Sequence, residues 1–478
     1  MCSTKFSYGI PSLVAAALAL GGCMVGPDYR TPNLPVPESW QAPKPHQANN
    51  ENLLDWWQQF DDPVLTELVS LAENDSPTLE QAYASIVQAR STLTSSRAAA
   101  LPEASGSVSK SRSRQTLENI SAISESTSAG LDASWEIDLF GKLRRASQAA
   151  RARVEARIDD WHDARVSLAA EVADTYVQYR GCRQLVNLYE QQLASLRETA
   201  RVTQIAQAAG FTSPADAALI SASRASSNST FIDQRSECDL LRKSLVELTG
   251  ASEPRLVELL DTPGEERLPE PAGLTVTAVP ADLLRQRPDL ASSERELAAA
   301  NAEVGEAIAN RFPSLSLTGS IAIGLDSDTS RTWSIGPSLS VPLFDAGERR
   351  AAVTSAQAAY DSAVAGYRQS LRTVVLEVEQ ALVNLDAARR REGESEEAAQ
   401  GYQAYFEAID RYWEAGGVSL LDREDARRQA LDQQIELVTL RQNQVRYWIA
   451  LYKALGGGWR VEQNTASQPP AMQNGETL

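Results

Sequence analysis

Apolar side chains recur at alternating spacings of four and three residues throughout residues 141–209. This spacing is the period of a coiled-coil helix. The segment contains no proline, and Gly181 is its only internal glycine, so nothing in it breaks a helix. We therefore predict one continuous helix of roughly 100 Å, which is too long for a compact domain. Its apolar positions are Val154, Ile158, Trp161, Leu168, Val172, Tyr179, Cys182, Val186, Tyr189, Leu193, Leu196 and Ala200.

The helical period is lost within residues 103–138. Apolar and polar side chains alternate there from Leu131 to Ile137, which predicts a strand with one apolar and one polar face. We expect a weaker partner strand over residues 105–114 and a loop over residues 117–126. Strands of about ten residues are long enough to cross a membrane as part of a barrel.

The same order of elements occurs twice, which predicts an internal repeat over residues 63–280 and 281–458. Leu139-Phe140-Gly141 precedes the first long helix, and Leu343-Phe344-Asp345 precedes the second. The predicted fold class is therefore mostly α-helical with a β-sheet part. The first half contains a helix, a strand pair (103–138), the long helix (141–209), a shorter helix (214–249) and a loop-rich segment (251–280), and the second contains a helix (288–311), a strand pair (314–343), a long helix (346–415) and a shorter helix (419–455).

The N-terminus has the composition of a secretory signal followed by a lipid attachment site. Residues 1–22 contain a basic start, a short apolar run and small residues, and Cys23 follows them as in a bacterial lipobox. We predict that Cys23 carries a diacylglycerol and becomes the new N-terminus; the alternative is a plain signal peptide with an incidental cysteine. The prolines of residues 23–62 predict an extended tether, and residues 459–478 are expected to form a disordered tail.

Composition and charge exclude several functions. The net charge of −18 leaves no basic stripe for the phosphates of a nucleic acid. Two histidines and three methionines make a metal cluster improbable. The chain also lacks a Gly-rich phosphate loop, a nucleophile elbow and a paired-cysteine motif. We therefore expect a protein that is not an enzyme and that needs no cofactor or metal.

Two cysteines of the mature chain are placed to meet. Cys182 and Cys238 lie equally far before and after Gly210, where the chain is expected to reverse. They would then stand at the same height on two antiparallel helices. Because the periplasm is oxidising, we predict a Cys182–Cys238 disulfide. The alternative is that both are small core residues without a bond.

The predicted strands also require an oligomer. A sheet inside a bilayer has to close, because no water is present to satisfy the hydrogen bonds of its edges. One chain supplies about four strands, whereas the smallest membrane barrels use about eight. Two chains would give a barrel filled by its own side chains, and three would leave room for a channel.

Five short motifs add a family resemblance: Gly26–Tyr29 behind the lipobox, Trp135–Lys142, Arg287–Leu290, Phe312–Pro313 and Val341–Gly347. In this order they resemble the signature segments of the TolC-like outer membrane factors, and the lipobox is similar to that of the lipoprotein branch, the OprM/NodT type. The resemblance implies a homotrimer with a 12-stranded β-barrel in the outer membrane and an α-helical barrel in the periplasm. The implied function is passive: an exit duct for drugs or other small toxic compounds. An inner-membrane pump of the resistance-nodulation-division type would deliver them through a periplasmic adaptor.

The resemblance also implies roles for two turns and for the segment behind the second turn. Leu421, Asp425 and Arg428 match the family positions that narrow the periplasmic gate. Arg423 and Glu424 depart from the family pattern, which has less charge there. The residues that match the adaptor-docking tips are Gly210, Phe211, Thr212, Ser213, Gly416, Gly417, Val418 and Ser419.

Two alternative functions remain open. One is the outer membrane component of a type I protein secretion system, which has the same fold but exports polypeptides. The other is a periplasmic coiled-coil lipoprotein without a pore, which would account for the helices but not for the alternating strands.

Overall fold

The computed structural model divides the chain into two compact units, and each unit takes segments from both halves of the repeat. The first unit contains residues 1–34, 83–159 and 291–369, and the second contains residues 35–82, 160–290 and 370–478. The structure describes residues 24–32, 41–42, 56–117, 120–261, 267–269, 287–325 and 330–457, without the side chains of residues 115–122. Cys23, the signal 1–22, the tail 459–478 and most of the segment 251–280 therefore lie outside the described residues.

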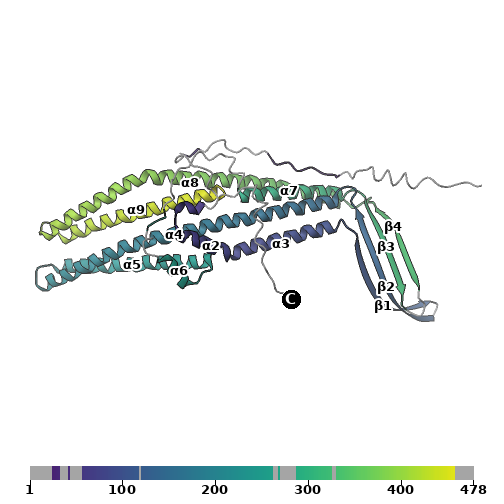
Figure 1. Ribbon diagram of the computed structural model, residues 1–478, viewed down its shortest axis with the longest axis horizontal. Coiled ribbons are helices and arrows are strands. Elements are labelled where there is room, and N and C mark those ends of the chain that lie inside the picture. Colours follow the sequence, from purple (N-terminus) through teal and green to yellow (C-terminus); the bar gives the residue numbers. More distant parts are fainter. Residues whose placement is uncertain are drawn as a thin grey trace, which may run out of the picture. The chain divides into compact units, whose positions relative to one another are not determined.

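Helices and strands follow one another in the same order in both halves of the chain (Figure 1). The two long helices α4 and α8 contain 67 residues each, and the helices α3 and α7 that precede the strands contain 22 each. None of the described helices is long and apolar enough to span a membrane. The elements are η2 (Trp56–Phe60), α2 (Pro63–Asn74), α3 (Pro77–Ala98), β1 (Glu103–Leu117), β2 (Ile120–Ile137), α4 (Lys142–Ala208), α5 (Pro214–Thr249), α6 (Glu253–Leu260), α7 (Pro288–Ala309), β3 (Ser314–Gly324), β4 (Arg331–Ser340), α8 (Glu348–Glu414) and α9 (Leu420–Ala454).

The first unit holds one antiparallel sheet in the order β1-β2-β3-β4, so β1 and β4 are its edges. β1 pairs with β2 along its whole length, up to Leu117↔Ile120. The prediction of a loop over residues 117–126 was therefore wrong. The segment is rich in serine, but its hydroxyls bond to those of the opposite strand, as in the 2.7 Å contact between the Oγ atoms of Ser111 and Ser126. Such cross-strand hydroxyl pairs stabilise a sheet.

The second strand pair is shorter than the predicted range 314–343. β4 ends at Ser340. Pro342 follows, and proline has no N–H group to donate to a neighbouring strand. Leu343, which the alternation had included in the strand, is 91% exposed beyond its end, as is the following Phe344.

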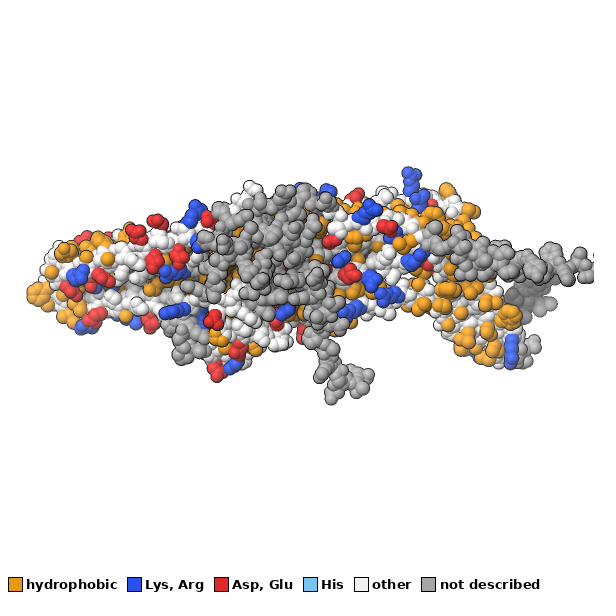
Figure 2. Space-filling model, turned by 45° about the horizontal axis from the view of Figure 1, so that its top comes forward, with side chains coloured by type: hydrophobic (Ala, Val, Ile, Leu, Met, Phe, Trp, Pro, Cys, Tyr) orange, Lys and Arg blue, Asp and Glu red, His pale blue; other side chains and the backbone are white. Residues whose placement is uncertain are grey.

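The two faces of the sheet have opposite chemistry. Directly paired residues point to the same face, and one such row contains Leu131, Ile321 and Trp333. The opposite face is lined by hydroxyls, with Oγ–Oγ distances of 3.0 Å between Ser109 and Ser128 and 2.9 Å between Ser320 and Ser334. The apolar face is exposed within the chain: its row members are 63%, 53% and 75% exposed. Figure 2 shows hydrophobic side chains gathered over this sheet.

The core of the second unit includes residues that we had predicted to lie in a tether. Trp56, Trp57 and Phe60 form η2 and are buried in the main hydrophobic cluster together with α2, α4 and α6. The Trp56 ring stacks on that of Tyr452, with 5.3 Å between the ring centroids. The segment 23–62 is thus not a tether throughout. Its proline content suggested an extended chain, but its aromatic side chains bury enough apolar area to fold.

Helix α4 packs against helices from the other half of the repeat in both units. In the first unit, Ala149 of α4 is buried against Ala299 and Ala302 of α7. In the second, Asp174 of α4 accepts a 2.7 Å hydrogen bond from Nε of Arg446 on α9. The repeats are therefore intertwined rather than separate domains, because each half covers apolar surface of the other.

Candidate functional site

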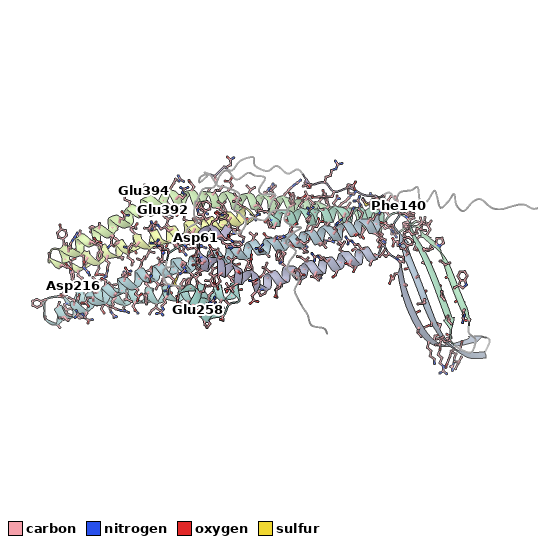
Figure 3. The ribbon with its side chains drawn as sticks, viewed as in Figure 1. Asp61, Phe140, Asp216, Glu258, Glu392 and Glu394 are labelled. Atoms are coloured by element: carbon pink, nitrogen blue, oxygen red, sulfur yellow. A yellow bond between two sulfur atoms is a disulfide. The ribbon has the colours of Figure 1, made fainter. Side chains whose placement is uncertain are left out.

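The N-terminal segment 24–32 is bound along the start of α4 in the first unit. Nε of Arg145 donates to the carbonyl oxygen of Val25 at 3.2 Å, and Nη2 donates to the carbonyl of Gly26 at 3.2 Å and to Oδ1 of Asp28 at 3.0 Å. The Arg145 side chain is only 3% exposed. The backbone N–H of Val25 donates to the carbonyl of Phe140, which lies between β2 and α4 (Figure 3).

Glycines allow this segment to approach the helices closely. A Cβ atom on Gly26 would lie 2.5 Å from the Cα of Gly305, and one on Gly141 would lie 2.6 Å from Cγ of Met24. Both Gly26 and Gly141 also have positive φ, which other residues rarely adopt. Cys23 directly precedes Met24 in the chain. The predicted lipid site is therefore next in sequence to a residue that packs against Gly141, between β2 and α4.

Sequence analysis did not identify Arg145 as a functional residue. The repeat pairs Arg144-Arg145 with Arg349-Arg350, and the described N-terminal residues 25–28 bond to the first pair, through Arg145. Arg350 is exposed, whereas Arg145 is buried. The motif Gly26–Tyr29 could have indicated this contact. A glycine in an extended segment often marks a place where the backbone lies close against another element.

The second unit contains a disulfide between α4 and α5. The sulfurs of Cys182 and Cys238 are 2.04 Å apart and their Cα atoms 5.6 Å apart. Both cysteines are buried in the main hydrophobic cluster. Nε2 of Gln234 donates to the Cys182 sulfur at 3.1 Å.

We expect that replacing both cysteines, Cys182→Ser with Cys238→Ser, will lower the free energy of unfolding by about 2–4 kcal/mol, because the bond closes a loop of 56 residues in the unfolded chain. Urea titration of both proteins, with and without reductant, measures this difference. Reductant should shift the wild-type curve and leave the double variant unchanged. Alkylation of both cysteines in unreduced, unfolded wild-type protein would contradict the bridge.

The two turns between paired helices have the same backbone design. Gly210 and Gly416 each adopt positive φ, +79° and +76°, and end a long helix. Ser213 and Ser419 then cap the next helix, each accepting a 3.1 Å hydrogen bond from the backbone N–H three residues on. Asp216 lies in the first turn of α5, where its carboxylate accepts a hydrogen bond from the Ser213 hydroxyl. It is labelled in Figure 3.

The surfaces of the two turns nevertheless differ. Phe211 follows the first glycine and is 87% exposed. Gly417 stands at the same place in the second turn and has no side chain to present. Of the predicted docking residues, Phe211 alone offers a large apolar side chain. A partner that contacts both turns would therefore meet an aromatic ring at position 211 and a glycine at the matching position 417.

The predicted gate residues lie on the exposed side of α9. Leu421 is 51% exposed. Nη2 of Arg428 donates to Oδ1 of Asp425 at 3.3 Å, and these two side chains are 64% and 52% exposed. The structure thus brings Asp425 and Arg428 together, as their spacing on a helix predicts. Exposed pairs of this kind contribute less than about 1 kcal/mol to stability.

A buried charge cluster lies on the opposite side of the same helix, and we define it as Arg423, Glu424 and Arg427 of α9 together with Asp410 of α8. Nε of Arg423 donates to Oδ1 of Asp410 on α8 at 2.5 Å, and its Nη1 donates to Oε1 of Glu424 at 3.1 Å. Glu424 also pairs with Arg427. Arg423, Glu424 and Arg427 are all less than 10% exposed.

The charge cluster joins α9 to α4 as well as to α8. Nη1 of Arg423 donates to Oγ1 of Thr199 at 3.0 Å, and Nη1 of Arg427 donates to Oγ of Ser195 at 3.3 Å. The Arg423 guanidinium also lies over the ring of Trp413, 4.5 Å from its centroid. Arg423 and Glu424 were the two residues that departed from the expected pattern, and the structure gives the reason: they fasten α9 to its neighbours.

Burial affects the acid–base properties of this cluster. Removal from water, and the positive charge of Arg423 nearby, lower the pKa of Arg427 to about 10, while Asp410 acts in the opposite direction. Nε of Arg427 is buried without a hydrogen-bond partner among the described residues. Arg427 stays charged at neutral pH, and Glu424 is the carboxylate that pairs with it directly.

The described residues contain no group of three or more histidine, cysteine, aspartate or glutamate side chains arranged to hold a metal ion. The chemistry of the chain lies in its surfaces: a two-faced sheet, a bound N-terminal segment, two helix turns and a charged segment behind one of them.

Comparison with known proteins gives consistent matches over nearly the whole chain. The family model "Outer membrane efflux protein" matches residues 68–251 and 279–457. The toluene efflux pump outer membrane protein TtgI of Pseudomonas putida is 31% identical over 468 residues, covering 94% of this chain and 98% of that protein. The outer membrane protein OprJ of Pseudomonas aeruginosa is 30% identical over 471 residues, covering 95% and 97%.

Solved structures match at the level of the fold. The outer-membrane channel OprN superimposes with a TM-score of 0.80 at 28% identity, covering 91% of this chain and 100% of that one. The CmeC outer membrane channel of Campylobacter jejuni gives a TM-score of 0.82 at 26% identity, covering 92% and 96%.

Proposed function

The chain belongs to the outer membrane efflux protein family, and on that premise we propose that it is the exit duct of a tripartite efflux system. In this proposal an inner-membrane pump of the resistance-nodulation-division type delivers small toxic compounds through a periplasmic adaptor. The chain conducts them passively across the outer membrane. It performs no chemistry on them.

The observation that carries this proposal is the two-faced sheet with open edges. β3 and β4 contain 11 and 10 residues, which matches the roughly 9–11 residues that a membrane strand needs. An exposed row such as Leu131, Ile321 and Trp333 suits lipid, and the hydroxyl face suits water. β1 and β4 each keep one unpaired edge in the sheet, so sister chains would have to complete it. Three copies would give 12 strands with a water-filled interior.

The bound N-terminal segment supports a lipid anchor on Cys23. Met24 and Val25 are held at the end of the sheet from which the helices leave. In the proposed orientation this end faces the periplasm, so acyl chains on Cys23 would enter the inner leaflet directly beside the sheet. A lipid at this point adds membrane affinity without a helical span.

Replacing the buried arginine of this segment tests its role. Arg145→Gln is expected to release residues 24–32, because three of the hydrogen bonds that hold them come from its guanidinium. Limited proteolysis of the purified protein should then cut the N-terminal segment at least about tenfold faster. The neighbouring Arg144→Gln, whose side chain is 46% exposed, is the matched control. Equal cutting rates in both variants would contradict the role of Arg145.

The turns and the segment behind them suit docking and gating. We assign adaptor docking to residues 210–213 and 416–419. Around a threefold axis, Leu421 and Asp425 of three copies would narrow the periplasmic end, and a ring of carboxylates there favours cations. The buried charge cluster would hold each α9 in this closed position.

Conductance in planar lipid bilayers tests the proposal directly. Purified protein is expected to form trimers in detergent and to open ion-conducting pores, whereas a periplasmic scaffold without a pore would do neither. A stable monomer without conductance would overturn the proposal. Capture of the adaptor, followed by identification of its pump, separates small-compound efflux from type I protein secretion.

A further inference from the structure

The apolar face of the sheet becomes basic toward the strand ends that lie away from the helices. Val108 of β1 is level with Ala129 and Ile323. Beyond Val108, the next three β1 side chains on the same face are Lys110, Arg112 and Arg114, because alternate residues of a strand share a face. On β4 the corresponding position, paired with Ile323, is Arg331. We call these four residues the basic strip: Lys110, Arg112, Arg114 and Arg331.

The four cations are exposed and only partly neutralised. All four side chains are exposed in the chain. Among the described side chains of this face, Glu125 is the single carboxylate, and its Oε1 lies 3.2 Å from Nε of Arg112. The two side chains are 50% and 67% exposed, so water weakens their attraction. Figure 2 shows a Lys or Arg side chain at this end of the sheet, beside the hydrophobic patch.

Charge is segregated between the two faces of the sheet. The register places Glu103, Asp132 and Glu136 on the hydroxyl face, together with the serines. No lysine or arginine stands on that face among its described side chains. A sheet that needed cations only for solubility would not have to place them all on the apolar face. The segregation indicates a ligand with two parts: an apolar part that covers the apolar side chains and an anionic part that meets the cations.

We infer that the basic strip binds the phosphate groups of the phosphorylated glycolipid that forms the outer leaflet of a Gram-negative outer membrane. This inference rests on the proposed function, because that function puts the helices in the periplasm and therefore the far strand ends at the outer surface. Acyl chains would cover the apolar rows. The head-group phosphates would then lie at the height of the basic strip.

The spacing of the basic strip suits several phosphates rather than one. Alternate residues of a strand are about 6.8 Å apart, so Lys110, Arg112 and Arg114 present three separate sites. Arginine binds phosphate with two parallel hydrogen bonds, which gives these sites geometric preference as well as charge. Trp333 lies one row inside Arg331, where an aromatic side chain suits the boundary between acyl chains and head groups.

The test compares lipid retention by two variants with four charge changes each. The first, Lys110→Ser with Arg112→Ser, Arg114→Ser and Arg331→Ser, removes the basic strip and keeps side chains that strands of this sheet already use. The control, Arg97→Gln with Arg151→Gln, Arg350→Gln and Arg390→Gln, removes four exposed cations from helices. Glu118, Asp326 and Asp328, which lie outside the described residues, are left unchanged in both.

Each protein is placed in phosphatidylcholine nanodiscs that contain lipid A or dephosphorylated lipid A, and lipid A per chain is counted by mass spectrometry after detergent washing. Wild-type and control proteins are expected to retain lipid A at least about tenfold over the dephosphorylated form, and the strip variant is expected to lose this preference. Equal retention of lipid A by wild type and strip variant would overturn the inference, as would equal retention of both lipids by wild type.

Conductance of the same proteins, measured in planar lipid bilayers, separates the two proposals. If wild type and strip variant both conduct and retain lipid A equally, only the basic strip is refuted. If wild type does not conduct, the proposed function fails whatever lipid is retained.

Discussion

Lysine in place of Ile321 is expected to abolish stable assembly in the outer membrane, while lysine in place of the adjacent Ser320 is expected to leave it intact. Ile321 stands on the apolar face between Leu131 and Trp333. A lysine on the lipid side of a membrane strand costs about 2–4 kcal/mol near the bilayer midplane. In a trimer the cost occurs three times, which is comparable to the total stability of many proteins.

The adjacent serine makes a sharp control because it differs only in the face it occupies. Ser320 lies on the hydroxyl face, paired with Asp132 and bonded to Ser334. A lysine there would point into water beside a carboxylate, so its cost is small. The fraction of membrane-extracted protein that migrates as an unheated trimer measures both variants. Equal losses in the two would contradict the assignment of the faces.

The second large effect is expected at the buried charge cluster. Glu424→Gln should destabilise the attachment of α9 by about 3–5 kcal/mol, because it leaves Arg423 and Arg427 buried with only Asp410 to balance them. We expect the first turns of α9 to exchange backbone hydrogens much faster than in wild type. The conducting state should also be populated more often, because these contacts hold α9 in the closed arrangement that we propose.

The next residue along the helix provides the control for this prediction. Asp425 is exposed, and its pair with Arg428 lies in water. Asp425→Asn should therefore change stability by less than about 1 kcal/mol. Hydrogen exchange over residues 420–430, with thermal unfolding, separates the two variants. If Glu424→Gln behaves like Asp425→Asn, the cluster does not hold α9.

Local patterns predicted most of the elements, and their failures have identifiable causes. The period of apolar residues located α4, because a helix of that length needs an unbroken apolar seam, and the internal repeat then located α8. The same approach missed the beginning of β2, since serine is common in loops and only a paired strand makes it useful. It also extended the tether to residue 62, past Trp56, Trp57 and Phe60, because the packing partners of these three aromatic side chains lie far away in sequence.

Charged residues were the hardest to interpret. Arg423 and Asp425 are two residues apart on one helix, yet one is buried and the other exposed. The residues around them in the sequence do not indicate which of the two is buried, because burial depends on where α4 and α8 lie. Arg145 is a similar case, since its partners in residues 25–28 are more than a hundred positions away.

Spacing along the chain was enough to predict the helical and strand periods and the duplication, and short motifs indicated the family. Tertiary structure alone decided which charges are buried, where the N-terminal segment is bound and how the repeats interlock. Those properties depend on desolvation and on contacts between distant segments, and a side chain's environment is set by neighbours that its own position in the sequence does not specify.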